Sequence, residues 1–179
     1  MRLYTGKGDQ GTTDLLGGRV GKDDPRIETI GALDETTSAL GLGRALATSK
    51  RAKDLLVEVQ RDLYQVMAEL AFTDELRPAS LALGGDRVDR LGEITDALAE
   101  EVEMPPRFIL PGDTVPGAAL DVARAVARRA EREAVALAHT GQIANPQILP
   151  YLNRLSSFLF VLARYEDRQA GVTPKAAKG

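Results

Sequence analysis

The chain has 179 residues, and its 23 Lys and Arg against 26 Asp and Glu give a formal net charge of −3 at pH 7. This near balance argues against a general nucleic-acid binder and against a polybasic membrane binder. With no Cys and one His, His139, the sequence excludes disulfides, thiolate catalysis and Cys-based or multi-His metal sites, and it disfavours Ser-His-Asp catalysis.

Two features of the sequence concern its location. The first 14 residues carry no apolar run after their basic residues, so they do not form a secretory signal. No stretch of about 18 apolar residues occurs that would cross a membrane. We therefore expect a cytoplasmic protein with no membrane partner.

The chain begins with a glycine-rich segment. Six of its 17 glycines fall within the first 21 residues, and such a density is incompatible with a stable helix. We predict that residues 1–25 form an ordered or ligand-ordered loop.

Helical periodicity takes over after this segment. Apolar residues recur at a spacing of three to four, and the hydrophobic content of 44%, heavily Ala, Leu and Val, favours helices over a β-sandwich. Pro105 and Pro106 end the third periodic stretch. The predicted helices cover residues 27–48, 52–72, 87–102, 117–139 and 147–169.

Five long helices with short connections predict an all-α fold, a five-helix up-and-down bundle with an N-terminal glycine-rich loop. There is no internal repeat and no low-complexity linker, so we expect residues 1–179 to form a single domain. Residues 171–179 are small or polar, and we expect them to form a disordered tail.

The glycine-rich segment has the composition of a phosphate-binding loop. Gly6, Gly8 and Gly11 match the spacing of a dinucleotide fingerprint, but the strand before it and the helix after it are missing. Backbone N–H groups in such a run can form an anion nest, to which nearby hydroxyls and Lys7 add donors. Lys22 supplies a second cation, so polyphosphate is the natural ligand. On composition alone, a flexible tail is the alternative.

The fourth predicted helix carries a polar stripe. At about 100° per residue, five charged residues fall within a sector about 100° wide. An exposed face with intrahelical ion pairs explains such a stripe, but three arginines in it favour recognition of planar phosphate or carboxylate groups. The five residues are Asp121, Arg124, Arg128, Glu131 and Arg132.

Two other helices carry polar positions that allow two interpretations. In the first, Asp34 begins a line of small residues, and it is either a surface acid or the partner of an arginine across a close helix contact. In the fifth, Asn153, Ser157 and Arg164 share a face with Phe160. A phenylalanine within a polar stripe is either singly exposed or covered by a second subunit.

Taken together, these segments resemble the PduO-type cobalamin adenosyltransferases, which are ATP:cob(I)alamin adenosyltransferases. The similarity extends from Tyr4 to about Tyr165. Each matching stretch alone is weak, but all of them in the family order and spacing make a specific signal. They are residues 4–12, 22–24, 31–35, 108–112, 122–132 and 153–156.

The resemblance implies a homotrimer of five-helix bundles with active sites between adjacent subunits. It implies transfer of the 5′-deoxyadenosyl group of ATP to cob(I)alamin, which yields adenosylcobalamin and triphosphate. The activity involves ATP, Mg²⁺ and cobalamin, the last as a substrate, and a flavoprotein reductase is a candidate partner. Because cob(I)alamin is itself the nucleophile, the lack of Cys and the single His are no obstacle.

The resemblance also assigns an ATP site. The glycine-rich loop would fold over the triphosphate, and Arg128 and Glu131 would bind ATP and its magnesium, with Asn153 nearby. Glu131 is the candidate for contact with Mg²⁺, and no other protein ligand to the metal is expected. The implied ATP-binding residues are Thr5, Gly6, Lys7, Gly8, Asp9, Thr12, Thr13, Lys22, Arg128, Glu131 and Asn153.

Further residues are implied at the subunit interface and at the corrinoid. Asp34 and Arg124 would pair across the subunit interface. Phe108 would lie beneath the corrin ring, where it keeps the lower axial ligand off cobalt. The implied catalytic set is Arg128, Phe108, Asp34 and Arg124.

Three positions depart from the family pattern. Asp113 follows a Leu-Pro-Gly turn where glycine is usual, Asp121 stands where histidine is common, and Ser157 stands where aspartate often occurs. They concern the corrin side of the site and leave the implied arginines and Phe108 in place. Because glycine tolerates positive φ, we expect an unusual backbone conformation at Asp113.

Two other functions are compatible with the same residues. A nucleotide-binding regulator would use the loop without corrin turnover, and it would have no use for Phe108. A structural helical bundle would carry a disordered N-terminal segment that ATP does not protect from proteolysis.

Overall fold

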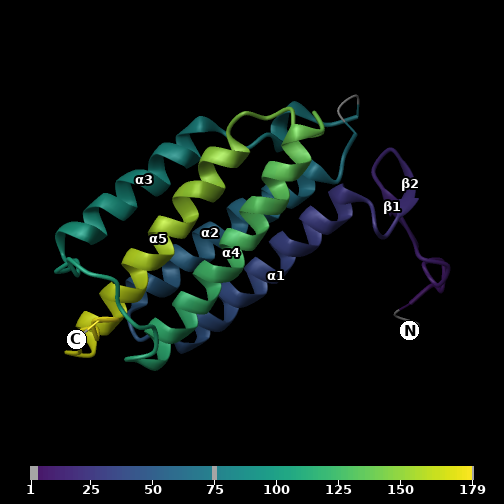
Figure 1. Cartoon of the computed structure of the whole chain (residues 1–179). Coiled ribbons are helices and arrows are strands. Elements are labelled where there is room, and N and C mark those ends of the chain that lie inside the picture. The colour runs from purple at the N-terminus through teal and green to yellow at the C-terminus, as the bar shows by residue number, and fades with distance from the viewer. Residues whose placement is uncertain (1–3, 74–75, 179) are drawn as a thin grey trace.

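Five long helices make up most of the chain in the computed structural model, which describes residues 4–73 and 76–178 (Figure 1). The predicted all-α bundle is confirmed, with helix ends that differ from the predicted ones by a few residues. The helices are α1 Pro25–Leu46, α2 Lys50–Leu70, α3 Gly85–Glu100, α4 Val115–His139 and α5 Ile148–Gln169, and a short 3₁₀ turn, η1, covers Ala79–Leu81.

Helix starts are marked by side chains that accept hydrogen bonds from first-turn N–H groups. Asp24 accepts from the N–H of Arg26 at 2.8 Å before α1, and Thr114 accepts from the N–H of Gly117 at 3.0 Å before α4. Both helices also have proline in the first turn. Such caps satisfy donors that have no partner within the helix, so they fix where these two helices begin.

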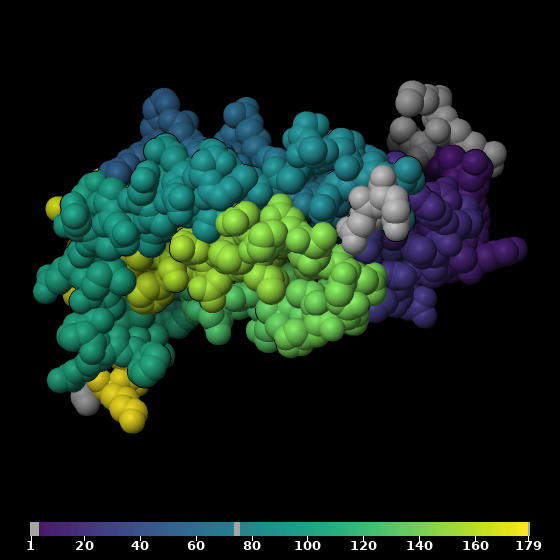
Figure 2. Space-filling model, turned by 90° about the horizontal axis from the view of Figure 1, so that it is seen from above, coloured from purple at the N-terminus to yellow at the C-terminus, as the bar shows by residue number. Residues whose placement is uncertain are grey.

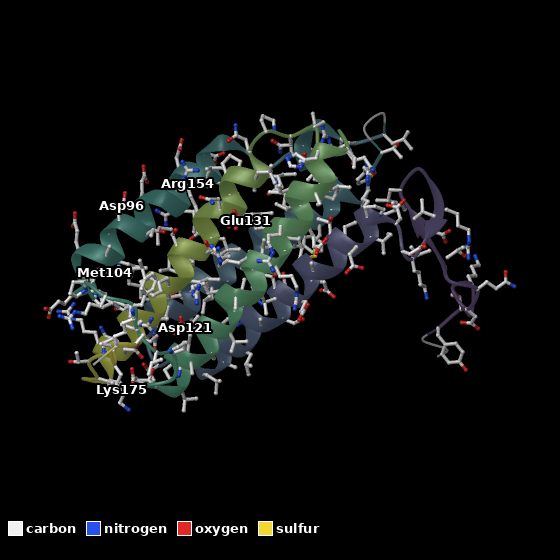
Figure 3. The ribbon with its side chains drawn as sticks, viewed as in Figure 1. Asp96, Met104, Asp121, Glu131, Arg154 and Lys175 are labelled. Atoms are coloured by element: carbon white, nitrogen blue, oxygen red, sulfur yellow. The ribbon has the colours of Figure 1, made fainter. Side chains whose placement is uncertain are left out.

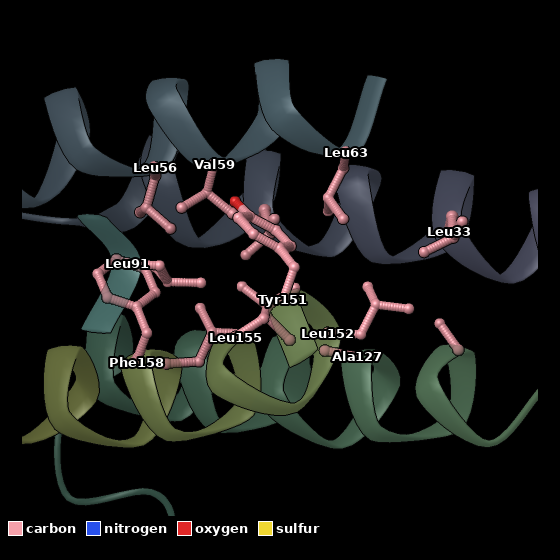
Figure 4. Close-up of a cluster of buried hydrophobic side chains, with 14 of the residues drawn as sticks. Leu33, Leu56, Val59, Leu63, Leu91, Ala127, Tyr151, Leu152, Leu155 and Phe158 are labelled. Atoms are coloured by element: carbon pink, nitrogen blue, oxygen red, sulfur yellow. The ribbon is translucent and has the colours of Figure 1, made fainter. Parts of the chain in front are cut away.

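Helix α4 lies between α1 and α5, while α2 packs mainly on α1 and α3 on α5 (Figure 1). The buried face of α4 is a stripe of small residues, among them Ala123, Ala127 and Ala130, which lets the neighbouring helices approach closely. Larger side chains such as Phe158 and Leu63 fill the core between the helices (Figure 4). None of the helices in the described part of the chain is long and apolar enough to cross a membrane.

A small β-hairpin lies within the predicted N-terminal loop, beyond the start of α1 (Figure 1). Strands β1 (Thr12–Leu15) and β2 (Gly18–Gly21) pair antiparallel. The N–H of Leu16 donates to the carbonyl of Ala71 at 2.9 Å, which fastens the hairpin turn to the end of α2. The strands are short and hold few apolar residues, so they lack the alternation that predicts a strand. Residues 1–3 of the predicted loop lie outside the described residues.

The C-terminal segment also differs from its prediction. Residues expected to form a disordered tail run antiparallel to the loop between α3 and α4, with a bridge between Ile109 and Ala176. Gly179 lies outside the described residues. Within the loop, Gly112 has a φ of 115°, whereas no described non-glycine residue has a positive φ. The expectation of an unusual backbone at Asp113 is therefore wrong, because Gly112 makes the turn.

A buried polar cluster joins α2, α3 and α5. The Arg87 guanidinium donates to both carboxylate oxygens of Asp62, at 2.9 and 2.8 Å, and the Tyr151 hydroxyl donates to Asp62 Oδ2 at 2.8 Å. Burial, followed by the nearby Asp62 charge, raises the pKa of Tyr151 well above its ordinary value. The cluster therefore holds a neutral phenol against a paired carboxylate in the core.

We expect Tyr151→Phe to lower the free energy of unfolding by about 2 kcal/mol at pH 7, because a hydrogen bond to a charged group is lost. The raised pKa adds a pH dependence. Above pH 10 the phenol ionises in the unfolded chain before it does in the fold, so wild-type stability falls and the difference between the two proteins shrinks. Urea denaturation measures both effects. The control, Tyr64→Phe, changes an exposed tyrosine, and equal losses in both variants would contradict the assignment.

Candidate functional site

The glycine-rich segment folds into two successive turns ahead of the hairpin. The N–H of Asp9 donates to the carbonyl of Gly6 at 3.2 Å, and that of Gly11 donates to the carbonyl of Gly8 at 3.1 Å. Gly6 and Gly11 have φ angles of 72° and 76°, which side-chain-bearing residues rarely adopt. The glycines are thus required by the path of the backbone, and the segment is ordered by its own turns.

Lys22 closes this segment. Its N–H donates to the carbonyl of Gly11 at 2.8 Å, and its ammonium lies beside Gly8. A Cβ added at Gly8 would come 3.2 Å from both Lys22 Nζ and the Thr12 carbonyl oxygen. The absence of a side chain at Gly8 therefore leaves room for the lysine, and the structure brings these implied ATP-binding residues together.

Arg19 organises the segment, although the sequence analysis did not identify it. Its guanidinium donates to the hydroxyl of Thr12 at 2.9 Å, to the carbonyl of Lys7, and to the carboxylate of Asp14 at 3.1 Å. Asp14 and Arg19 are directly opposite each other in the hairpin. An opposite-charge pair across a short turn was the signal that could have revealed both the hairpin and this residue.

The polar stripe of α4 faces the surface beside α1. Arg128 is exposed, as is Asp34 on α1, and the neighbours of these two residues, Arg129 and Glu35, form an ion pair across the two helices. Asp34 and Arg128 consequently lie at a similar level on one face. Arg124 is half-buried, one turn closer to the start of α4.

A second link joins the stripe to α5. The side-chain amide of Asn153 donates to Glu131 Oε1 at 3.0 Å, so two implied ATP-binding residues are in contact. Figure 3 shows Glu131 about midway along α4. The predicted polar face thus extends over α1, α4 and α5.

Two members of the predicted stripes are buried. Asp121 on α4 and Arg164 on α5 are 6% and 3% exposed, and they form an ion pair at 2.9 Å. Arg164 also donates to Asp167 at 2.8 Å, and Arg124 donates to Asp121 at 3.4 Å. Periodicity placed Asp121 and Arg164 on outer faces, but each turns towards the neighbouring helix because it finds an opposite charge there. Asp121 therefore holds Arg124 from the inside.

Phe108 lies at the end of the bundle where α4 begins. It is 92% exposed, and it belongs to an open groove of about 520 Å³ lined by residues 105–109, Arg124 and Phe160. The groove brings together Phe108, which is implied at the corrinoid, and Arg124, which is implied at the subunit interface. Phe160 is half-buried under the Arg164 guanidinium, 5.3 Å from its ring centroid.

One chain does not bring all the implied site residues together. Arg26, in the first turn of α1, donates to the carbonyl of Gln142, which follows the end of α4. The glycine-rich segment leads into α1, so it lies near that end of α4. Phe108 precedes the start of α4. With 25 residues at about 1.5 Å each, α4 is about 37 Å long, and it lies between the glycine-rich segment and Phe108. The partner that Arg124 finds within the chain is Asp121, while Asp34 lies exposed on α1. The implied pair of Asp34 with Arg124 stays a prediction, since it would form between subunits.

The residues present fit a magnesium ion that arrives with a nucleotide. Within residues 4–73 and 76–178, no group of three or more acidic or histidine side chains could hold a metal by itself. Mg²⁺ commonly keeps its waters and binds through substrate phosphates plus one or two carboxylates. Glu131, half-buried and oriented by Asn153, offers one such carboxylate.

Known proteins of one family resemble this chain. A family model described as cobalamin adenosyltransferase matches residues 3–166. The chain is 38% identical over 176 residues to the corrinoid adenosyltransferase of Bacillus subtilis (strain 168), across 96% of this chain and 90% of that protein. It is 40% identical over 172 residues to corrinoid adenosyltransferase PduO of Salmonella typhimurium, but it spans only 51% of that protein's length and 95% of its own.

A solved structure resembles the whole fold. A PduO-type ATP:corrinoid adenosyltransferase from Lactobacillus reuteri, a phenylalanine-to-alanine variant complexed with cobalamin and ATP, superposes with a TM-score of 0.90 at 31% identity. The match covers 99% of this chain and 100% of that chain.

We expect Asp121→Asn to lower the free energy of unfolding by about 2–4 kcal/mol, because it removes one of the two charges that compensate buried Arg164. Urea denaturation of the variant measures the loss. Asp96→Asn is the matched control, since Asp96 is exposed on α3 and its replacement should change stability by less than about 0.5 kcal/mol. A similar small change at Asp121 would show that the buried pair is not needed for the fold.

Proposed function

This chain belongs to the cobalamin adenosyltransferase family, and from that premise we propose that it transfers the 5′-deoxyadenosyl group of ATP to cob(I)alamin, yielding adenosylcobalamin and triphosphate. One observation carries the proposal. The same chain combines a glycine-rich segment closed by Lys22 with an exposed Phe108 in an open groove. A protein that only bound nucleotide would use the first feature and not the second.

The chemistry suits the residues present. Cob(I)alamin attacks the 5′ carbon of ATP, a Co–C bond forms, and the C–O bond to the triphosphate breaks with its electron pair leaving on oxygen. No proton has to be moved by the protein, so the reaction needs alignment of two substrates and cations around the leaving group. Lys7, Lys22 and Arg128 are the cations that we assign to the triphosphate.

Phe108 is assigned to the corrin ring. A large apolar side chain that is 92% exposed gains nothing from burial within its own chain, so its value lies in what it contacts. Placed under the corrin ring, its bulk would keep a lower ligand away from cobalt. That would favour four-coordinate cob(II)alamin, which is easier to reduce to the nucleophile.

The assembly that we propose is a homotrimer with sites between subunits. Support comes from the glycine-rich segment and Phe108, which lie at opposite ends of α4, a helix about 37 Å long, within one chain. Exposed apolar side chains on α1 and α4, such as Leu42 and Val122, are also suited to burial against another subunit. Mg²⁺ bound with ATP near Glu131 and a flavoprotein reductase as electron donor belong to the same proposal. The cytoplasmic location stays a prediction from the sequence.

The proposed activity is tested by mixing the purified protein, MgATP and chemically reduced cob(I)alamin without oxygen. Absorbance then follows the conversion to adenosylcobalamin, and a sample without ATP is the control. ATP-dependent conversion is expected, and its absence in a folded protein would reject the activity. In parallel, MgATP should slow tryptic cleavage at Lys7, and equal cleavage with and without MgATP would reject the nucleotide role of this segment.

Arg128→Ala should lower turnover at saturating ATP by about 10²–10³-fold, because it removes a positive charge beside the developing charge of the leaving triphosphate. The control is Arg61→Ala, which removes an exposed arginine on α2, away from α4. Turnover of Arg128→Ala within twofold of wild type would contradict the role of Arg128 in the reaction.

Asp34→Ala and Arg124→Ala should each weaken the trimer or the shared site, since we propose that the two side chains pair between subunits. Light scattering reports the assembly, and the turnover assay reports the site. Asp96→Ala, on the exposed face of α3, serves as control. Two variants that stay trimeric and fully active would eliminate this pair from the proposal.

A further inference from the structure

The C-terminal segment forms a strap across the loop that carries Phe108. We define the strap as residues 172–178 and the α3–α4 loop as residues 101–114. The N–H of Leu110 donates to the carbonyl of Lys175 at 2.9 Å, and the N–H of Ala177 donates to the carbonyl of Phe108 at 2.7 Å. The strap therefore binds the backbone of Phe108 itself. Figure 2 shows the strap (yellow) beside the loop, at the end of the molecule opposite the N-terminal segment (purple).

Asp113 clasps the strap to the loop. Its carboxylate accepts the backbone N–H of Lys175 at 2.9 Å, and the ammonium of the same lysine lies 3.5 Å away. The Asp113 side chain is 9% exposed, whereas that of Lys175 is 79% exposed. At its other end the strap continues from α5, where the N–H of Val172 donates to the carbonyl of Asp167 at 2.9 Å.

The loop needs this support because the bundle does not fill the space beneath it. A cavity of about 370 Å³ lies between residues 102–107 of the loop, Arg164 and Arg168 of α5, and the strap. This pocket is open to solvent, so the loop residues that line it have few packing contacts with the bundle on that side. The hydrogen bonds to the strap replace the missing contacts.

We propose that Asp113 is a positioning residue which, through the C-terminal strap, fixes the backbone of Phe108 at the corrinoid groove. The functional consequence rests on the proposed function, whereas the clasp itself does not. Glycine or alanine at position 113 would leave the N–H of Lys175 without its acceptor. The strap would then detach more often, and Phe108 would sample positions that do not meet the corrin ring.

The first test uses the protein without ligands, so that it is independent of the activity. Three proteins are compared with wild type: Asp113→Ala, a chain that ends at Gly171, and the control Asp96→Ala on α3. Hydrogen exchange of the Leu110 amide should become about tenfold faster in the first two and stay unchanged in the control, because the hydrogen bond to the Lys175 carbonyl is what closes that amide. Unfolding curves check that the bundle remains intact in each. Equal exchange in Asp113→Ala and wild type would overturn the clasp.

The second test separates positioning from general damage. The KM for cob(I)alamin should rise about five- to tenfold in Asp113→Ala and in the shortened chain, while the KM for ATP stays within about twofold, because the ATP segment lies at the far end of α4. Asp113→Asn keeps an acceptor oxygen and should restore most of the effect. Faster turnover of the shortened chain, or an equal rise in both KM values, would overturn the positioning role. If wild type lacks turnover while the exchange result holds, the proposed function fails and the clasp stands.

Discussion

The ion pairs that Arg164 makes with Asp121 and Asp167 fix the end of the bundle at which Phe108 lies. A buried guanidinium is costly unless each nearby carboxylate is held in place, so this cluster tolerates little movement. Its partners reach outwards in two directions. Asp121 also accepts from Arg124 in the groove, and Asp167 accepts from Thr114, the cap of α4, at 2.6 Å. The position of the groove beside Phe108 therefore depends on buried charges on α4 and α5.

The arrangement along α4 divides the work of the reaction. In the proposed site, the glycine turns and Lys22 lie near one end of α4, Phe108 lies at its other end, and Arg128 lies between them. A helix of 25 residues, about 37 Å long, therefore lies between the glycine-rich segment and Phe108 within one chain. The reaction requires no proton transfer by the protein, so the absence of Cys and the single His do not prevent it. The protein's contribution is the placement of two reactive molecules, and the reactivity resides in the corrinoid.

The sequence alone predicts the helices, because their apolar spacing is regular over many turns and proline or glycine marks the breaks. It also predicts that Glu131 and Asn153 share a site, although only through family resemblance. It does not predict the burial of Asp121 and Arg164. Helical periodicity assigns a residue to a face of its own helix, but it does not show which charged side chain lies opposite on the neighbouring helix. The contacts of Arg19 are not predicted for a similar reason, because they depend on the hairpin, which places Arg19 opposite Asp14.

Because Phe108 is exposed, packing in a core does not fix its position. An aromatic side chain in a core is fixed by its neighbours, but one that is 92% exposed gains few such contacts from its own chain. Its position has to come from the backbone, and the backbone here is a loop over a cavity. The φ of 115° at Gly112 turns the loop, and Asp113 then follows with a side chain that glycine would not provide. The aspartate at position 113, where the family pattern has glycine, is thus the residue that binds the C-terminal strap to the loop.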